Sequence, residues 1–250
     1  MSSSVRWLAA LLLVVVALRA DDALRDARRA QALLGPEIWS RVLRIDNDSW
    51  ASPYPRVVHA LVFEFSGVLW FYTAAEGTQS LSLYRHETAA DKASLGPLLL
   101  EIDRGFRRWR ELATEPPRGR IAHGVLRNGC FIESIVALRA RLALGRDAAQ
   151  PQLLAYYAEG RLPLRGHTVL AFVSASRVGV LDPAGNGTER WFDGAALRDP
   201  LALARQLGGQ QVTRARLFRL EVPPEWRRDP ATNSGESATA DAANLTVTFR

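Results

Sequence analysis

The stretch His167-Thr-Val-Leu-Ala-Phe-Val-Ser-Ala-Ser-Arg-Val-Gly-Val-Leu-Asp182-Pro183 predicts two short β-strands joined by a small polar turn. If the strands pair as a tight hairpin centred between Ser174 and Ala175, His167 and Asp182 stand directly opposite each other. Opposed side chains of an antiparallel pair share one face, with Cβ atoms about 4.5–5.5 Å apart. The sequence therefore predicts a carboxylate beside an imidazole at the end of this hairpin.

Cys130 is the only cysteine of the chain, and it lies where an arginine-rich stretch gives way to an apolar helical pattern. Apolar residues at three- to four-residue spacing from Phe131 to Leu144 predict a helix that stops at Gly145. A thiol at a helix N-terminus meets backbone N–H groups and the positive end of the helix dipole, and both favour the thiolate. A lone cysteine in a helix is more often a packing residue, so its prediction as a nucleophile depends on the histidine and carboxylate farther along the chain.

Thiol, imidazole and carboxylate are the three parts of an activated cysteine nucleophile. Asp182 is expected to accept from one ring nitrogen of His167 and to leave the other directed at the Cys130 sulfur. We therefore predict Cys130, His167 and Asp182 as catalytic residues. The backbone N–H of Cys130 would be one oxyanion donor, and the side chain of Asn128 or Gln79 would supply a second.

Neither a metal nor another cofactor is expected. His59 lies in an apolar strand pattern, and His86 and His123 show no ligand spacing with it or with each other. The net charge of +6 comes almost wholly from arginine, since Lys92 is the only lysine. These arginines are scattered and are not interleaved with aromatics in a compact run, so no nucleic-acid partner is predicted.

Residues 1–20 have the order of a secretion signal, with Arg6, an apolar run from Trp7 to Leu18, and Ala20 before two aspartates. The run is too short to span a bilayer comfortably, because a transmembrane helix needs about 20 residues. We expect an exported protein, periplasmic or secreted. A membrane anchor formed by a retained N-terminal segment is the second interpretation, and a buried helix is the third.

The rest of the chain predicts one α+β domain over 21–228, in which the cysteine-bearing helix packs on an antiparallel sheet. Residues 229–250 are predicted to be a flexible tail, because 229–243 are polar and lack an apolar period. The predicted elements are a helix over 21–40, a hairpin over 57–73, a strand over 79–84, helices over 94–112, 131–144, 152–158 and 201–207, the hairpin over 168–182, and a strand over 212–222.

A cysteine that opens a helix, a histidine that opens a later strand and an Asp182-Pro183 pair that ends the next strand resemble the papain-like superfamily of thiol enzymes. Transglutaminase-like proteins and the peptidase domains of bacteriocin exporters are the most similar members. The segments Gly166-His-Thr-Val-Leu-Ala-Phe and Val178-Gly-Val-Leu-Asp-Pro-Ala-Gly185 are similar to the peptidase form, and the short distance from Cys130 to the histidine is similar to the transglutaminase form. The match covers residues 125–187.

The resemblance implies a papain-like or transglutaminase-like core and an exported cysteine enzyme. Such an enzyme would act on a peptide or protein substrate, either as a thiol protease or by transferring an acyl group at an amide bond. Two features depart from the family: Thr168 replaces an aromatic, and the usual glutamine upstream of Cys130 is missing. These departures, and the unmatched residues 21–120, motivate the alternative of a non-catalytic binding or scaffold module on the same fold.

Overall fold

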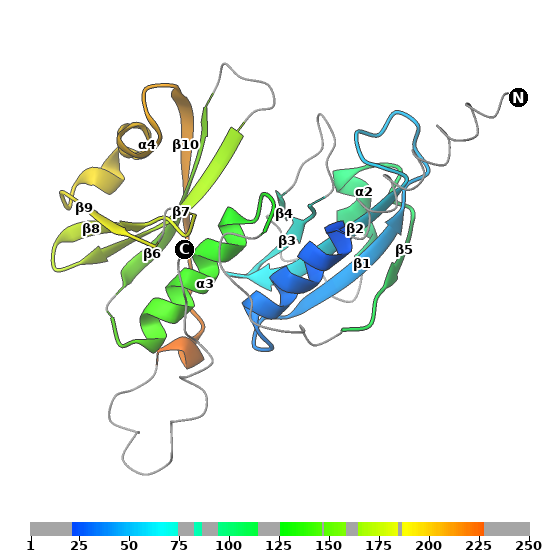
Figure 1. Ribbon diagram of the computed structural model, residues 1–250, viewed down its shortest axis with the longest axis horizontal. Coiled ribbons are helices and arrows are strands. Elements are labelled where there is room, and N and C mark those ends of the chain that lie inside the picture. Colours follow the sequence, from blue (N-terminus) through cyan, green and yellow to red (C-terminus); the bar gives the residue numbers. More distant parts are fainter. Residues whose placement is uncertain are drawn as a thin grey trace, which may run out of the picture. The chain divides into compact units, whose positions relative to one another are not determined.

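The computed structural model describes residues 22–74, 83–86, 95–114, 126–146, 148–158, 165–184 and 187–227. Within them the chain forms two compact units (Figure 1). The first unit holds the described residues up to 114 together with 126–128, and the second holds those from 129 onward. Each unit contains one five-stranded antiparallel sheet. The α+β class is as predicted, but there are two sheets and not one.

The sheet of the first unit has the order β4-β3-β2-β1-β5. Its strands are β1 (Ser40–Asp46), β2 (Val57–Phe65), β3 (Val68–Tyr72), β4 (Leu83–His86) and β5 (Arg108–Glu111). Residues 22–34 are helical, and α2 (Gly96–Ile102) adds Leu98 and Leu99 to a buried core with Phe71 and Phe106. The predicted hairpin over 57–73 is confirmed, since Ser66 and Gly67 form a two-residue turn with φ of 55° and 71° between β2 and β3.

The helix predicted over 94–112 is wrong beyond Ile102. Asp103 accepts a hydrogen bond from the backbone N–H of Gly105 at 2.7 Å, which closes a turn directly after α2. The chain then re-enters the sheet as β5, where Trp109 pairs with Ile45 of β1. The apolar spacing that resembled a helix comes from Phe106, which fills the core from the turn, and from this strand. Strand β1 itself was not predicted.

The sheet of the second unit has the order β10-β6-β7-β8-β9. Its strands are β6 (Ala149–Ala158), β7 (Arg165–Ser174), β8 (Arg177–Leu181), β9 (Glu189–Phe192) and β10 (Val212–Arg219). The helices are α3 (Cys130–Ala143) and α4 (Pro200–Gly208), with short 3-10 turns η1 (Ala196–Arg198) and η2 (Pro224–Trp226). The predicted helices over 131–144 and 201–207 are thus confirmed, and Gly145, with φ of 67°, ends α3 as expected.

The helix predicted over 152–158 is wrong, because these residues form most of β6, up to its end. Tyr156 and Tyr157 are aromatic residues of the kind that strands favour. The strand pairs with β7 on one side and with β10 on the other, so every backbone polar group in this stretch has a ladder available. Pairing between distant segments therefore overrides a weak local helical pattern.

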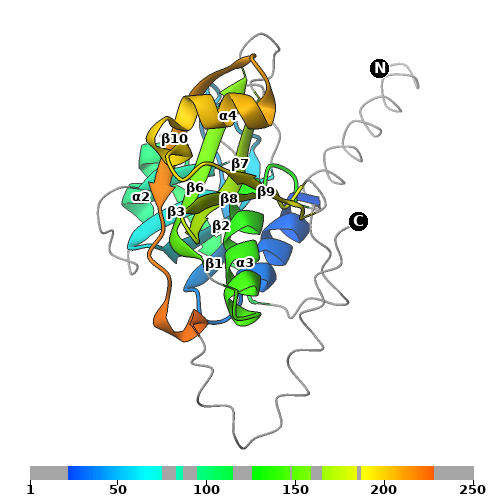
Figure 2. The same cartoon turned by 90° about the vertical axis from the view of Figure 1, so that its left-hand side faces the viewer.

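Helices α3 and α4 cover opposite faces of this sheet. Successive strand residues point to opposite faces, and α4, which crosses β6 and β10 in Figure 2, shares a buried cluster with Val169 and Ala171 of β7. The guanidinium of Arg141 in α3 instead lies 4.0 Å from the ring centre of Phe172, which points to the other face. The central strand β7 is therefore buried on both sides over its apolar middle, from Val169 to Phe172.

Two polar contacts fix α3 to the sheet near its beginning and near its end. The Ser134 hydroxyl donates to the backbone carbonyl of Thr168 in β7 at 3.3 Å. Near the other end, Arg141 forms an ion pair with Glu189 of β9 while its side chain is only 8% exposed. Because the two contacts are seven residues apart on a rigid helix, they fix both the position and the direction of α3.

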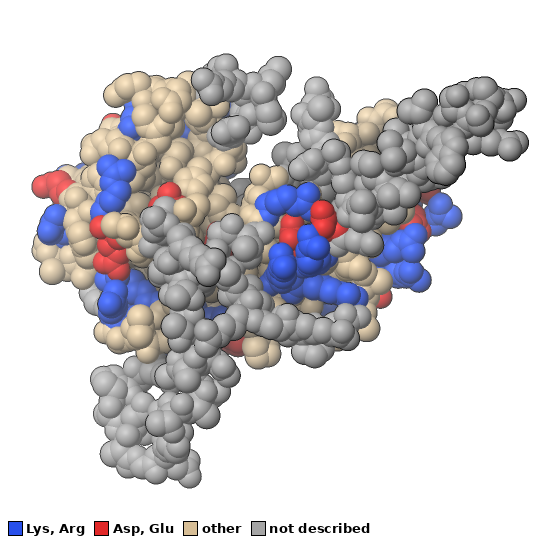
Figure 3. All heavy atoms as spheres, in the orientation of Figure 1, with Lys and Arg blue, Asp and Glu red and all other residues tan. Residues whose placement is uncertain are grey.

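Surface charges of both signs are interspersed. On the face drawn in Figure 3, arginine and acidic atoms are neighbours in several places. In the first unit, Arg41 pairs with Glu111 and Arg108 pairs with Asp48, each at 2.7 Å. Exposed pairs of this kind contribute little to stability, but they reduce the local positive charge.

We predict that Arg141→Met lowers the free energy of unfolding by about 3 kcal/mol, because it leaves Glu189 without its buried partner. Arg146→Met is the matched control: Arg146 also faces Glu189, at 3.7 Å, but is 62% exposed, so its loss should change the free energy by less than about 1 kcal/mol. Urea unfolding followed by circular dichroism measures both values. Equal effects of the two substitutions would contradict the role given to the buried pair.

Candidate active site

Cys130 is the first residue of α3, and its side chain is half-buried. The N-cap is Gly129, which has no side chain with which to cap the helix. The first intrahelical bond runs from the Glu133 N–H to the Gly129 carbonyl at 3.0 Å. The N–H groups of a first helical turn have no intrahelical acceptor and carry the positive end of the dipole. The thiol therefore sits where a negative charge on sulfur, or on an oxygen bound beside it, is stabilised.

His167 and Asp182 meet at the open end of the β7–β8 hairpin. The distance from His167 Nε2 to Asp182 Oδ2 is 3.0 Å, and the side chains are 27% and 36% exposed. The other carboxylate oxygen, Oδ1, accepts from the Ala184 N–H at 2.9 Å. One oxygen of Asp182 thus holds the loop that follows β8, and the other holds the imidazole.

The register of this hairpin differs from the predicted one. Ser174 pairs with Arg177, so the two-residue turn consists of Ala175 and Ser176, with φ of 46° and 67°, and its centre lies one residue later than predicted. In this register the extension of β8 places Asp182 across from Val169, two residues along β7 from His167. A shift by an even number keeps both side chains on one face, so they meet diagonally and not directly opposite.

The second nitrogen of His167 is left for Cys130. Since Asp182 contacts Nε2, we assign to Nδ1 the interaction with the Cys130 side chain that contributes to the pKa of His167. Burial alone would lower the pKa of His167. The hydrogen bonds with Asp182 and Cys130, and the negative charges of the carboxylate and a thiolate, outweigh burial and raise the pKa from 6.5 to about 10. The contact with Asp182 thus favours the protonated imidazole.

Tyr156 is a residue of this site that the sequence prediction missed. It is the cross-strand neighbour of His167, and the two rings lie edge to face with centres 5.5 Å apart. Burial, followed by the charges of Asp182 and Cys130, raises the pKa of the Tyr156 phenol to about 12. Gly208 at the end of α4 leaves room for the ring, because a Cβ there would lie 2.7 Å from it. The aromatic pair at 156–157 could have indicated a strand residue beside His167. It was not interpreted in this way because residues 152–158 were predicted to be a helix.

The two predicted oxyanion side chains remain predictions. Asn128 is exposed and lies in the turn before α3, with φ of 56°, and belongs to the first unit. Gln79 lies outside the described residues. The backbone N–H of Cys130 is the donor that the helix start provides, and a second donor is not identified among the described residues.

Two of the remaining histidines are described, and both belong to the first unit. His59 is a buried residue of β2 in the first unit, and its carbonyl accepts from the Thr73 hydroxyl at 2.7 Å. His86 belongs to β4 of the same unit, and His123 lies outside the described residues. Among the described side chains, no three of the metal-binding types are grouped as ligands.

Comparisons with protein-family models, with curated protein sequences and with solved structures returned no significant match. In the part of the chain that the structure describes, no helix has both the length and the apolar character required to cross a membrane.

The ion pair in this site should make stability depend on pH. Because folding raises the pKa of His167 above its unfolded value of 6.5, the imidazolium stabilises the fold fully below about pH 6.5, and this stabilisation is lost as the pH rises through about 10. We therefore predict that the loss of unfolding free energy caused by Asp182→Asn is largest near pH 6 and shrinks toward pH 10.

Urea unfolding of the wild type and the variant across this pH range measures the difference. Asp199→Asn is a matched control, because Asp199 caps α4 through the Ala202 N–H and its side chain is not bonded to a histidine. The effect of Asp199→Asn should stay constant over the same range. A loss that grows with pH for Asp182→Asn would contradict the prediction.

Proposed function

We propose that the protein is a cysteine enzyme that acts on amide bonds of a peptide or protein substrate, with Cys130 as nucleophile. The observation that supports this most directly is the chain of contacts within the second unit. Asp182 binds Nε2 of His167, and His167 binds the thiol of Cys130 at the start of α3. Each group thus has the neighbour that its role in nucleophilic catalysis requires.

In the proposed reaction, Cys130 Sγ attacks the carbonyl carbon of the amide, and the carbonyl electrons move to oxygen. The N–H groups at the start of α3 stabilise the resulting oxyanion. When the C–N bond breaks, His167 gives its Nδ1 proton to the leaving nitrogen, and a thioester with Cys130 remains. Water or an amine then attacks the thioester, His167 takes up the proton of the attacking group, and the carbon–sulfur bond breaks.

Asp182 acts through His167 and not on the substrate. Its Oδ2 fixes the ring so that Nδ1 faces the sulfur, and its charge stabilises the imidazolium. The hydrogen bond from Ala184 to the other oxygen keeps the carboxylate from turning away. Hydrolysis and acyl transfer share every step up to the thioester, so this machinery serves both.

The papain-like or transglutaminase-like core is part of the same proposal. Its support is the chain order of a helix that begins with Cys130, a strand with His167 near its start, and Asp182-Pro183 directly after the next strand. The antiparallel sheet against which the helix packs agrees with that order. We propose no nucleic-acid partner and no metal in the mechanism.

We predict that an iodoacetamide-type electrophile labels wild-type Cys130 faster than it labels a free cysteine in a model peptide near neutral pH. His167→Ala removes the imidazolium and should slow this labelling. Asp182→Asn should leave the protein folded near neutral pH, although with the lower stability predicted above, and should lower turnover by orders of magnitude because the ring is no longer held in the required tautomer. Mass spectrometry of the labelled peptide measures the rate.

Asp199→Asn again serves as the control, since it removes a carboxylate from the same unit without contacting His167. Slow and equal labelling of the wild type and His167→Ala would contradict the proposed activity. That result would favour the non-catalytic module on the same fold.

We also propose that the protein is exported and that residues 1–20 are removed. The support is the signal-like order of those residues in the sequence. Expression of the full chain in a bacterial host should give a mature protein that begins near Asp21 and is recovered from the periplasm or medium. N-terminal sequencing decides this, and an intact N-terminus in the membrane fraction would indicate a retained anchor.

A further inference from the structure

The imidazole of His167 has an aromatic ring beside it, which comes from the neighbouring strand of the second unit. Tyr156 of β6 pairs with His167 of β7, and the two rings lie edge to face with centres 5.5 Å apart. Tyr156 is only 8% exposed and belongs to the buried cluster that α4 shares with the sheet. Its hydroxyl makes no hydrogen bond to another described residue. The contact with His167 is therefore made by the ring of Tyr156 and not by its hydroxyl.

The end of α4 contacts the same ring. A Cβ at Gly208 would lie 2.7 Å from Cε2 of Tyr156, so the ring fits here because the last residue of α4 is a glycine. This end of α4 is itself tied to the sheet, since the guanidinium of Arg190 in β9 donates to the backbone carbonyl of Gln206 at 3.1 Å. The ring of Tyr156 is thus packed against a fixed helix end as well as against the imidazole.

The hydrogen bond with Asp182 leaves one motion of the imidazole open. In a histidine ring, Nε2 lies closer than Nδ1 to the continuation of the Cβ–Cγ bond, so rotation about that bond moves Nδ1 farther than Nε2. Such terminal torsions are broad and weakly restrained by themselves. The bond of 3.0 Å between Nε2 and Asp182 therefore restrains the direction of Nδ1 poorly. An aromatic neighbour restrains it better, because rings at this distance favour the edge-to-face arrangement over a face-to-face one.

We propose that Tyr156, packed against the end of α4, is a positioning residue that sets the rotation of the His167 ring and so directs Nδ1 at Cys130. This inference rests on the proposed function of Cys130. The phenol stays neutral in this role: burial, followed by the charges of Asp182 and Cys130, raises its pKa to about 12, and Arg190 acts in the opposite direction. Tyr156 thus restrains the imidazole by packing, without adding a charge to the site.

The next residue of β6 supplies a matched control. Tyr157 is also a tyrosine that packs on the beginning of β7, where it pairs with Gly166, and a Cβ at Gly166 would lie 2.7 Å from its ring. Successive side chains of a strand point to opposite faces, so the Tyr157 ring lies on the face opposite Tyr156. Removing the ring of Tyr157 therefore tests whether any loss of aromatic packing at this end of the sheet has the same effect.

The test compares Tyr156→Leu, Tyr156→Phe, Gly208→Ala and Tyr157→Leu in the full chain. Iodoacetamide labelling reports the reactivity of Cys130, and the ¹⁵N NMR signals of the His167 ring report whether the ring keeps one orientation. We expect Tyr156→Leu and Gly208→Ala to lower the labelling rate about tenfold, since small misplacements of a reacting group have effects of this size or larger. The ring signals should broaden in both variants. Tyr156→Phe, which keeps the ring, and Tyr157→Leu should leave both readings unchanged.

A double variant separates positioning from a general loss of structure. If Tyr156 acts through His167, then Tyr156→Leu should lower the labelling rate no further once His167→Ala is present, because the two residues act as one unit. An equal loss with and without His167 would overturn the inference, as would sharp ring signals in both Tyr156→Leu and Gly208→Ala. If Cys130 of the wild type labels slowly while the ring signals respond as expected, the proposed function fails and the positioning of the imidazole by Tyr156 stands.

Discussion

The packing of α3 on β7 is the contact on which the candidate site depends. The helix carries Cys130 at its first position, the strand carries His167 near its beginning, and nothing in the local sequence relates the two. Ser134 bound to the Thr168 carbonyl fixes the first half of the helix, and the buried pair of Arg141 with Glu189 fixes the second. Since a helix is rigid over this length, two contacts suffice to bring the thiol to the imidazole.

The electrostatics of the site follow from where the hairpin ends. Beyond Leu181 the chain leaves the ladder, so Asp182 can direct one oxygen at His167 and the other at the backbone of the following loop. Tyr156 packs against the imidazole and leaves the ring partly desolvated. Low local exposure strengthens the interactions with Asp182 and Cys130, which is why these outweigh the cost of burying the charge.

The predicted contact between His167 and Asp182 is present despite an error in the predicted register, and the reason is the period of the strand. Side chains alternate between the faces of a strand with a period of two, and the turn centre was misplaced by one residue, which changes the pairing by two. The face was preserved, and His167 still meets Asp182. The helix predicted over 152–158 was wrong for a different reason. A short run of apolar and aromatic residues fits a helix or a strand equally well until its pairing partners are known. For that reason Tyr156 was not predicted as a neighbour of His167.

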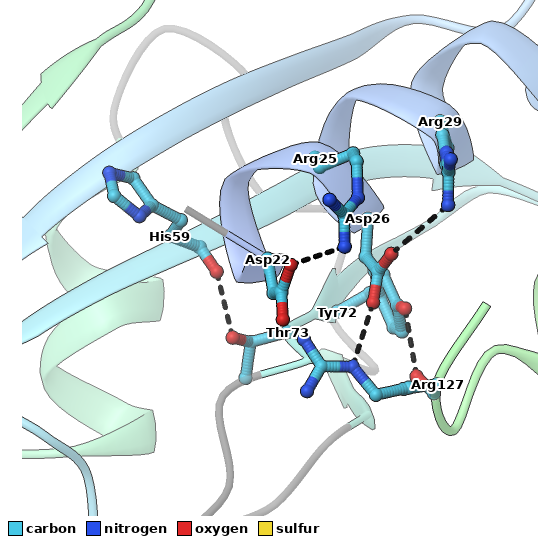
Figure 4. A network of polar contacts seen from close by, with 8 residues as sticks. All are labelled: Asp22, Arg25, Asp26, Arg29, His59, Tyr72, Thr73 and Arg127. Atoms are coloured by element: carbon cyan, nitrogen blue, oxygen red, sulfur yellow. Dashed lines mark hydrogen bonds and ion pairs between the residues drawn. The ribbon is translucent and has the colours of Figure 1, made fainter. Parts of the chain in front are cut away.

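The sequence by itself determined the local features: the extent of α3 and its stop at Gly145, the two tight hairpins, and the order of a thiol, an imidazole and a carboxylate along the chain. These depend on side-chain periodicity and turn residues, which act over a few positions. Only the tertiary structure decided the division into two units, the strand at 149–158 and the ring of Tyr156 beside His167. It also decided the pairing of Asp26 with Arg127 inside the first unit, where Arg127 Nε donates to Asp26 Oδ2 at 3.0 Å (Figure 4). Each of these joins segments far apart in the chain, and such pairings are fixed by packing and by burial of polar groups, for which a single sequence carries no local signal.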